Sequence, residues 1–342
     1  MPGTPFESNG SDVVISSRVR LARNLNDFPF PLKMTREHEL KVLDRVRDSV
    51  LNIKKSQKNK FTFIDIGQLD ALNRQVLLEK HLISPDMAQS SRERGVLISG
   101  DGTISIMINE EDHVRLQCIY PGMRIDDAWK KCSEIDSLLE EKVDFAFSRD
   151  YGYLTGCPTN AGTGIRASAM LHLPALTMTG YIKNLLEACR KLGVAVRGLY
   201  GENSEASGNM FQISNQVTLG QSEEEIVSSI SRIVEQIVDQ ERTIRNDMLK
   251  QNPYRFEDKV YRSLGLVSNA RIMSTEEALK LLSDVRLGVD MGIIMSVKKE
   301  ILDNLLVAIQ PANLQKNSGK TLNPEERDIK RAEIVRKSLT LE

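Results

Sequence analysis

The segment GVLISGDGTISIMINEEDHVRLQCIY occupies residues 95–120 and decides the class of the fold. Its first half contains two β-forming runs around a Gly-Asp-Gly turn, which is the pattern of a β-hairpin. Residues 114–120 predict a third strand, with Val114, Leu116 and Cys118 on one face. We therefore expect an α+β fold in which helices pack on an antiparallel sheet, and not a parallel nucleotide-binding sheet.

Residues 1–251 are expected to form this α+β domain. The further elements that the sequence predicts in it are a helix over 179–193, strands over 194–201 and 209–215, and a long helix after 222. The long helix is expected to begin at Ser222, because Ser222 and Glu225 have the spacing of a capping box. Isoleucines recur behind them at intervals of three and four residues, which is helical spacing.

Residues 252–342 are almost entirely helical in pattern and predict a separate all-helical C-terminal domain. Ser274 and Asn323 are expected to begin two of its helices, since each precedes a glutamate by three residues. The polar stretch 310–320 is expected to be a loop between helices. The apolar faces of these helices exceed the needs of one small domain, which predicts a homodimer or a larger homo-oligomer.

The charges of the chain are balanced. Its 342 residues include 46 lysines and arginines against 47 aspartates and glutamates, a net charge of -1. Without a global basic field the chain is not expected to bind nucleic acid, so any anion site must be local. The first ten residues lack the apolar core of a secretory signal, and no apolar run is long enough to span a bilayer. We therefore expect no membrane partner and a cytoplasmic location.

The four cysteines show no Cys-x-x-Cys spacing, so free thiols are expected and no metal site is predicted. Three of them, Cys118, Cys132 and Cys189, have the surroundings of core residues. Cys157 lies between a glycine and a proline and is expected in a loop. The Walker-type phosphate loop and the motifs of eukaryotic-type protein kinases are absent from the sequence.

The stretch ISSRVRLARN at residues 15–24 places three arginines within six residues. In a strand, Arg18 and Arg20 share one face while Val19 and Leu21 share the other. Two adjacent guanidinium groups repel each other, so an anion is expected between them. Either acidic side chains on the surface fill that role, or a phosphate does, because its oxygens match the planar fork of an arginine.

Four other segments are candidates for function. NEEDHVR (109–115) is either a positioned carboxylate base or a solvated turn. CPTNAGTGIRAS (157–168) combines a cysteine, two glycines and Arg166 at the start of an expected helix, which favours a ligand site over a simple tight turn. RGLYGENSEASGN (197–209) is either a mobile flap over substrate or an ordinary acidic loop. ERDIKRAEIVRKS (326–338) places two arginines on one helical face, which is the usual pattern of a solvated surface.

Taken together, SSRVRLARN, NEEDHVR, CPTNAGTGIRAS and RGLYGENSEASGNMFQISN resemble, in this order, the signature blocks of the phosphagen (guanidino) kinases. The blocks cover most of residues 13–220, and RDIKRAE extends the resemblance to the end of the chain. The signature blocks of this chain are most similar to those of the bacterial family members that phosphorylate arginine side chains of proteins. The resemblance implies a phosphagen-kinase catalytic domain that uses ATP, with Mg²⁺ bridging the phosphates.

The resemblance also implies roles for individual residues. The resemblance implies contacts with the phosphates of ATP for Arg18, Arg20, Arg166 and Arg197. It implies a supporting role there for Arg23 and Arg115. It makes Glu111 the base that takes a proton from the accepting guanidinium. Glu202 would hold another edge of the same group, and Cys157 would lie beside a non-reacting nitrogen as a thiolate. A carboxylate suits the role of base because it both orients a guanidinium bidentately and accepts its proton. On the last helix, the resemblance implies a role in phosphoarginine binding for Arg327, Asp328 and Arg331.

Two departures from the small-metabolite members of the family bear on the substrate. The first arginine block begins at residue 16, so the helical N-terminal domain that encloses the substrate in those enzymes is not expected. The site should then be open enough for an arginine on a protein surface. Thr218 stands in SNQVTLG (214–220) where those enzymes carry an arginine, so no phosphate contact is assigned to it.

The resemblance further implies a role in stress response and protein quality control, in which marked proteins pass to a Clp-type unfoldase-protease. Expected substrates are a heat-shock repressor and unfolded proteins with exposed arginines, and an activator protein is a further expected partner. Two alternatives stay open, an adaptor or pseudokinase that binds phosphoarginine and a kinase of free arginine. The intact set of Glu111, Glu202, Cys157 and arginines favours an active enzyme over the adaptor. The missing N-terminal domain disfavours free arginine as the substrate.

Overall fold

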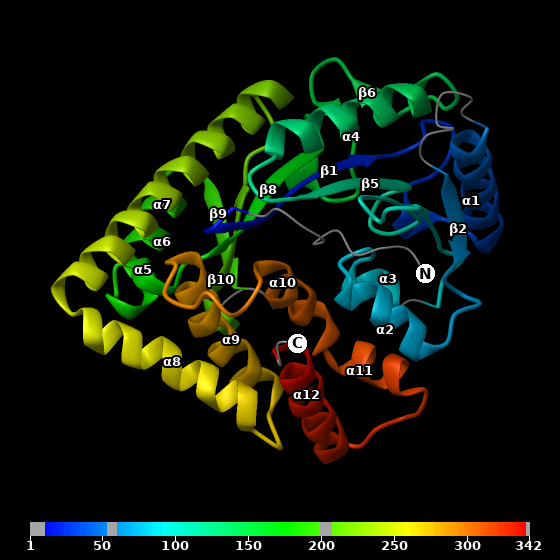
Figure 1. The fold of residues 1–342 in the computed structure, drawn as a ribbon. Helices are drawn as coiled ribbons and strands as arrows, with labels where there is room; N and C mark the ends of the chain where they lie inside the picture. Colours follow the sequence, from blue (N-terminus) through cyan, green and yellow to red (C-terminus); the bar gives the residue numbers. More distant parts are fainter. Residues whose placement is uncertain (1–10, 53–59, 90, 199–206, 340–342) are drawn as a thin grey trace.

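A computed structural model describes residues 11–52, 60–89, 91–198 and 207–339 of the chain. Its centre is an eight-stranded sheet in the order β2-β3-β4-β5-β1-β8-β10-β9, in which neighbouring strands are antiparallel (Figure 1). The strands are β1 (Val14–Arg23), β2 (Phe61–Asp65), β3 (Gly95–Ser99), β4 (Ile104–Ile108), β5 (Val114–Pro121), β8 (Ile165–His172), β9 (Val194–Gly198) and β10 (Met210–Asn215). The expected α+β fold with an antiparallel sheet is therefore confirmed.

The hairpin predicted in the segment 95–120 is formed by β3 and β4, which pair with Gly95 opposite Ile108. Gly102, in the turn between them, adopts a left-handed conformation with a φ of 73°, which costs glycine little. β5 then pairs with β4 on one side and with β1 on the other. This pairing places β1, which carries the first arginine block, in the middle of the sheet.

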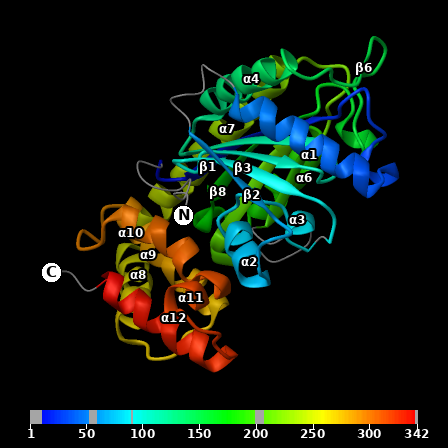
Figure 2. The same cartoon turned by 90° about the vertical axis from the view of Figure 1, so that its right-hand side faces the viewer.

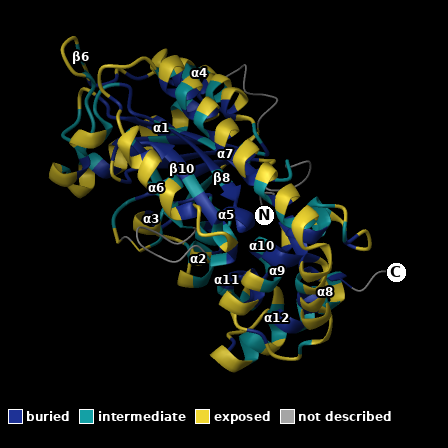
Figure 3. Cartoon of the chain, turned by 90° about the vertical axis from the view of Figure 1, so that its left-hand side faces the viewer, coloured by how far each residue is buried: buried dark blue, intermediate teal, exposed yellow. Residues whose placement is uncertain are grey.

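Helices cover one face of the sheet more fully than the other. As Figure 2 shows, α1 (Arg36–Leu51), α4 (Ile125–Glu140) and α7 (Glu223–Gln251) lie on one side, and α2 (Ala71–Glu79) and α3 (Pro85–Gln89) lie on the other. The main apolar core lies between the sheet and α1, α4 and α7. In Figure 3 strands within the sheet such as β8 and β10 are mostly buried, while the outer sides of the helices are exposed. The less covered face is therefore the one on which a ligand has room.

The remaining elements of this region are short. They are the hairpin of β6 (Phe147–Ser148) and β7 (Gly152–Tyr153), the helices α5 (Pro174–Met178) and α6 (Ile182–Lys191), and 3-10 turns at Pro31–Lys33, Pro158–Asn160 and Ser207–Asn209. α6 confirms the helix predicted over 179–193, and Gly193 follows its end with a φ of 69°, as helix-terminating glycines do. None of the described helices is both long and apolar enough to cross a membrane.

The long helix α7 begins after Ser222, which forms the predicted capping box with Glu225. The helices that follow it are α8 (Pro253–Asn269), α9 (Thr275–Asp290), α10 (Lys299–Ala308), α11 (Pro311–Ser318) and α12 (Pro324–Leu339). They enclose a second apolar core. Ser274 caps α9, and α12 begins directly after Asn323, as predicted.

The stretch 310–320 is not a loop, which corrects the prediction, because α11 occupies Pro311–Ser318. Its first turn is stabilised from far away in the sequence. Glu79 at the end of α2 accepts hydrogen bonds from the backbone N–H groups of Ala312 (2.8 Å) and Asn313 (2.9 Å). Carboxylates are favourable at a helix N-terminus because four N–H groups there lack helical partners. The cap lies 233 residues away in the sequence, whereas the local signals of this helix are Pro311 at its start and Gly319 after its end, with a φ of 66°.

Candidate active site

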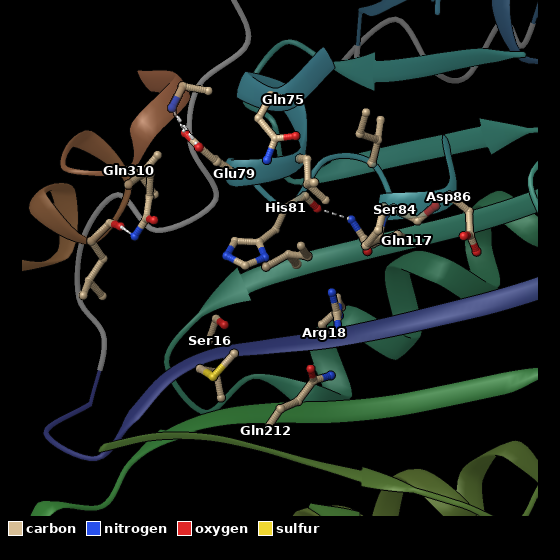
Figure 4. A pocket seen from close by; sticks show the side chains of 18 of the residues that line it. Ser16, Arg18, Gln75, Glu79, His81, Ser84, Asp86, Gln117, Gln212 and Gln310 are labelled. Atoms are coloured by element: carbon tan, nitrogen blue, oxygen red, sulfur yellow. Dashed lines mark hydrogen bonds between the residues drawn. The ribbon is translucent and has the colours of Figure 1, made fainter. Parts of the chain in front are cut away.

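The side chains of β1 alternate between two environments. Val19 and Leu21 are fully buried on the face that α4 covers. Arg18 and Arg20 point to the opposite face, where they line a cavity of about 1060 Å³, and Figure 4 shows Arg18 in that position. The predicted separation of the two arginines from the apolar residues is confirmed. It follows directly from the two-residue period of a strand.

Three further arginines reach the same cavity from three other strands of the sheet. Arg166 on β8 lies directly opposite Arg20, while Arg115 comes from β5 and Arg197 from β9. The expectation that Arg166 begins a helix is wrong, because it is the second residue of a strand. Gly164 directs the chain into that strand with a φ of 64°, and a side chain at this position would lie 2.7 Å from a carbonyl oxygen of β1.

Burial, together with repulsion between the charged guanidinium groups in the cavity, lowers the pKa of Arg18 and Arg20. Burial, and then Arg115 and Arg166, lowers the pKa of Arg18 to about 10. Burial and these neighbouring arginines also hold the pKa of Arg20 well below its usual value, and Glu110 opposes this shift only in part. Within the described residues, the buried Nε of Arg20 has no hydrogen-bond partner. Such a cluster of positive charges is stabilised when an anion binds between them.

Glu110 supplies a partial counter-charge. It is 2% exposed, and it accepts hydrogen bonds from Arg115 (2.6 Å) and from the hydroxyl of Ser84 (2.6 Å). Burial acts to raise the pKa of Glu110, but Arg115 and the hydrogen bonds outweigh burial and keep the pKa below its usual value. Glu110 is therefore ionised and engaged with Arg115, so arginines remain the dominant charge in the lining.

Glu111 lies in the turn between β4 and β5. Asn109 begins this turn in a left-handed conformation with a φ of 60°, and its side-chain amide donates to two backbone carbonyls (2.8 and 3.0 Å) that hold the turn in place. The carboxylate of Glu111 lies 3.4 Å from the side-chain nitrogen of Asn160. Partial burial and then the charge of Asp112 raise the pKa of Glu111. A carboxylate with a raised pKa is a stronger proton acceptor.

Asp112 holds the loop of Cys157 against this turn, a role that the sequence analysis missed. Its Oδ1 accepts a hydrogen bond from the backbone N–H of Gly156 at 2.5 Å. A side chain at Gly156 would lie 2.7 Å from the carbonyl oxygen of Glu111, so glycine permits this close approach. Cys157 itself is half-buried, with its Sγ 3.0 Å from the hydroxyl of Thr159. The segments that carry Glu111 and Cys157 are thus in contact, although neither residue is among the described residues that line the cavity.

Thr218 stabilises the other end of the same loop. Its hydroxyl lies 2.7 Å from the carbonyl oxygen of Ala161 and 3.0 Å from that of Thr159. Its own carbonyl accepts the backbone N–H of Thr163 at 3.0 Å. Thr218 therefore anchors the loop of Cys157, and its side chain is buried.

Arg23 does not reach the cavity, which corrects the role implied for it. It is 1% exposed, and its Nη2 donates to Asp136 of α4 at 2.8 Å. It also donates to the carbonyl of Thr163 (2.9 Å), and its guanidinium stacks on Tyr153 at 3.5 Å from the ring centroid. The reason is strand geometry, because position 23 is an odd number of residues from positions 18 and 20 and its side chain leaves β1 on the opposite face.

His81 is a cleft residue that the sequence analysis missed. It lines the cavity in a left-handed conformation with a φ of 58°, which is uncommon for residues other than glycine. Its carbonyl accepts a hydrogen bond from the side chain of Gln117 (2.8 Å), as Figure 4 shows. Burial and then Arg18 lower the pKa of His81 to about 4, so the imidazole is neutral near pH 7. A single histidine after a helix carries no sequence signal for this position.

The residues implied in phosphoarginine binding lie together on α12. Arg331 is 1% exposed, and it donates to two backbone carbonyls of neighbouring segments (3.0 and 2.8 Å) and to Asp328. These contacts engage Arg331 within the protein, and its implied role in phosphoarginine binding stays a prediction. Helical spacing explains its burial, since Arg331 shares the inward face with Val335 and Leu339. Arg327 and Asp328 are half-buried and closer to the surface.

Within the described ranges, no group of three or more His, Cys, Asp or Glu side chains is arranged to hold a metal ion. The acidic residues that line the cavity are Glu79, Asp86 and Glu110. Glu79 and Glu110 are both engaged with donors of the protein. Glu202, the second carboxylate implied at the guanidinium, lies outside the described residues.

Comparison with known families agrees with this geometry. A family model described as the C-terminal catalytic domain of ATP:guanido phosphotransferases matches residues 41–244. A second model, described as the C-terminal domain of the protein-arginine kinase McsB, matches residues 253–342. The first match begins within α1 and covers every strand of the large sheet except β1, and the second covers the helices α8 to α12.

Similar proteins include a protein-arginine kinase of Caldanaerobacter subterraneus subsp. tengcongensis, which is 52% identical over 324 residues, or 95% of this chain and 96% of the relative. A protein-arginine kinase of Bacillus pumilus is 49% identical over 97% of this chain and 91% of its own length. The duplicated taurocyamine kinase of Schistosoma mansoni, solved with transition state analog components, has a TM-score of 0.63 at 26% identity, over 71% of this chain and 35% of that one. The chain therefore belongs to the protein-arginine kinases of the ATP:guanido phosphotransferase family.

Proposed function

We propose that the cleft on the less covered face of the sheet transfers the γ-phosphoryl group of ATP to arginine side chains of proteins. One observation carries this proposal: arginines from four strands line one cavity, and Glu111 directly follows Glu110, a residue of the same lining. The arginines suit a transferable phosphate, and the carboxylate suits the guanidinium that accepts it. Family membership supports the same reaction.

The lining of the cavity fits a magnesium–nucleotide complex. Arginine side chains present planar forks that match phosphate oxygens, and a volume of about 1060 Å³ is ample for a ligand of this size. When bound, ATP supplies the γ-phosphoryl group and Mg²⁺ offsets part of its charge. Glu110, a carboxylate at the arginine-rich end, is engaged with Arg115. We therefore infer that phosphate oxygens and water, rather than side chains, hold the metal.

The accepting arginine requires activation, because a charged guanidinium is a poor nucleophile. In this proposal Glu111 accepts hydrogen bonds from two of its N–H groups and takes one of these protons as the N–P bond forms. The bond between the γ-phosphorus and the bridging oxygen breaks in the same step. Arg18, Arg20 and Arg166 stabilise the charge on the phosphoryl oxygens during transfer. The contact with Asn160 helps to orient the carboxylate of Glu111.

Cys157 and Glu202 complete the guanidinium site in this proposal. The hydrogen bond from Gly156 to Asp112 ties the loop of Cys157 to the turn of Glu111. This connection supports a position for the sulfur beside a non-reacting nitrogen of the accepting group. Glu202 is assigned by family resemblance alone, and it is proposed to hold another edge of the guanidinium.

We further propose that α12 binds phosphoarginine and thereby senses the product. Arg327 is proposed to bind the phosphoryl oxygens and Asp328 the guanidinium, a pairing that matches charge to charge on each side of the ligand. Arg331 contributes by positioning Asp328, to which its guanidinium donates a hydrogen bond. The same bond would bring Asp328 into a fixed orientation before the ligand arrives.

The proposed partners follow the family resemblance. They are a heat-shock repressor and unfolded proteins with exposed arginines as substrates, a Clp-type unfoldase-protease that receives the marked proteins, and an activator protein. The proposed location is the cytoplasm, and the proposed context is stress response and protein quality control. Self-association through the C-terminal region is supported by two large apolar side chains on its surface, Tyr254 on α8 at 84% exposure and Met295 in the segment between α9 and α10 at 85%.

The proposed reaction is tested by incubating the chain with Mg-ATP and an unfolded arginine-rich protein, with free arginine as a second acceptor. We expect phosphate on arginine of the protein, detected by mass spectrometry at neutral pH and lost in mild acid, which spares phosphoserine. The label should disappear in Glu111→Gln and persist in Glu224→Gln, a matched change of an exposed glutamate on α7. Acid-stable label, unchanged transfer by Glu111→Gln, or a preference for free arginine would contradict the proposal.

A further inference from the structure

The floor of the cavity changes in character along the strands. The cross-strand pairs that line it are, in order, Arg20–Arg166, Arg18–Ser168 and Ser16–Met170. Successive pairs on one face are roughly 6.6 Å apart along a strand. On β1 and β8, positive charge is therefore concentrated at one end, and the pair at the other end is uncharged. Arg197 of the edge strand β9 lies in the same row as Ser16 and Met170, across Gln212 of β10, so an arginine stands two strands beyond the uncharged pair.

The opposite wall at the uncharged end belongs to the C-terminal helices. The residues of α10, of α11 and of the junction between them that line the cavity include Leu306, Gln310, Pro311 and Gln315. Figure 4 shows Gln310 and Glu79 toward the end of the cavity where Ser16 lies, with Asp86 toward the other end. One continuous cavity thus joins the arginine cluster of the sheet to the C-terminal helices.

Specific contacts hold this wall in place. Glu79 of α2 accepts hydrogen bonds from the backbone N–H groups of Ala312 (2.8 Å) and Asn313 (2.9 Å) and from the side chain of Asn313 (2.8 Å). One turn further along α11, Lys316 donates to the side-chain oxygen of Asn73 at 2.8 Å. The first turn of α11 is therefore anchored to the catalytic region at the rim of the cavity, and its position there is a built feature of the fold.

We propose that helices α10 and α11 form part of the nucleotide site and cover the base and ribose of ATP. The inference rests on the proposed function, which places the phosphates of ATP on the arginines. With the phosphates beside Arg18 and Arg20, the rest of the nucleotide extends into the part of the cavity lined by Ser16 and Met170. Leu306 of α10 also lines the cavity, four residues before Gln310, and offers an apolar surface of the kind on which a base packs.

Nucleotide binding then connects the two regions of the chain. The phosphates contact the sheet, the base contacts α10 and α11, and one ligand stabilises both walls at once. A ligand that consists of the phosphates alone reaches only the sheet. The difference in affinity between ATP and such a phosphate-only ligand should therefore depend on the C-terminal helices.

This inference is tested by calorimetric titration of the full chain with Mg-ATP and with Mg-tripolyphosphate, which carries the phosphates but no base. We expect Leu306→Ala to weaken ATP binding about 5- to 20-fold, since part of the apolar contact with the base is lost. Tripolyphosphate affinity should change by less than about twofold. Leu266→Ala on α8, a position that is 55% exposed, is the matched control and should change neither affinity.

Hydrogen exchange of the unmodified chain supplies a second measurement, which stays decisive if Leu306→Ala folds poorly. We expect backbone amides of α10 and α11 to exchange more slowly when the site is saturated with ATP than when it is saturated with tripolyphosphate. Amides of β1 and β8, which contact the phosphates in both complexes, should be protected to a similar degree by the two ligands.

The results separate this inference from the function on which it rests. An ATP affinity in Leu306→Ala within about twofold of the unmodified chain, or equal losses for both ligands, would overturn the role of the C-terminal helices and leave the proposed kinase site intact. Equal protection of α10 and α11 by both ligands would do the same. Failure of both ligands to bind the unmodified chain would overturn the arginine site itself, and this inference with it.

Discussion

Arg18 and Arg23 leave the same strand, five residues apart, and meet opposite surroundings. Arg23 is 1% exposed, donates to Asp136 and stacks on Tyr153. Arg18 faces a cavity in which its strongest charged neighbours are other arginines, and their repulsion lowers its pKa in addition to the effect of burial. Arg23 therefore has its charge paired within the protein, whereas Arg18 is placed to bind an anion from outside the protein.

This contrast separates structural arginines from functional ones throughout the molecule. Arg245 is 1% exposed and donates to Glu241 at 2.7 Å, so it belongs with Arg23. Arg331 is buried to the same degree and is engaged by carbonyls and by Asp328. In the cleft, by contrast, like charges gather at a cost in stability, and such a cost is characteristic of binding and catalytic sites.

The largest expected effect is on the cleft side of the comparison. Arg18→Met should lower kcat/KM for phosphorylation of a protein substrate by at least about 100-fold, because a charge that stabilises the transferring phosphoryl group is lost. The free energy of unfolding should be unchanged or slightly higher, because repulsion in the cluster is relieved. Initial rates and urea denaturation measure the two quantities. A variant that is much less stable than the unmodified chain would place Arg18 with the structural arginines instead.

For Arg23, on the core side of β1, we expect the reverse: a large loss of stability and a small effect on activity. Arg23→Met should lower the free energy of unfolding by about 3 kcal/mol, because the buried carboxylate of Asp136 loses its partner. The folded fraction should retain most of its activity. Urea denaturation measures the loss, and the double variant Arg23→Met/Asp136→Leu should recover much of it by removing the uncompensated charge. No recovery in the double variant would show that the cost does not come from the ion pair.

The smallest expected effect concerns Glu111. Its pKa is raised, so this base takes up a proton at a higher pH than an ordinary glutamate does. Activity should be full above that pKa and should fall as the pH decreases through it, which appears as an acid limb in kcat/KM. Asp112→Asn removes a charge that raises the pKa and keeps an oxygen that can accept from Gly156, so the limb should move to lower pH. If the acid limb of kcat/KM stays at the same pH in Asp112→Asn, the group whose protonation limits activity is not Glu111.

Local patterns were sufficient to predict most of the fold. The hairpin at residues 95–120, the capping box at Ser222 and the alternation around Arg18 all depend on neighbours a few positions away, and the structure confirms each. The placement of Arg23 was also within reach, because the two-residue period of a strand puts it on the face opposite Arg18. The family resemblance drew attention to the residue but did not indicate on which face it lies.

Features that depend on distant partners could not be predicted from the sequence. α11 is capped by Glu79 from another region of the chain, and Arg23 pairs with Asp136 across 113 positions. Asp112 orients the loop of Cys157 through a backbone N–H, an interaction without a residue-type signature. Each of these contacts forms only after the sheet and its helices have brought separate segments together.

The most direct test of the contrast between the two faces of β1 is calorimetric titration of Mg-ATP into Arg18→Met and Arg23→Met, under conditions where both variants are folded. We expect Arg18→Met to bind ATP at least about 10-fold more weakly than the unmodified chain, because a charge-assisted contact with phosphate is lost. Arg23→Met should bind ATP with unchanged affinity. Equal losses in the two variants, or a larger loss in Arg23→Met, would contradict the assignment of the cleft arginines to the phosphates.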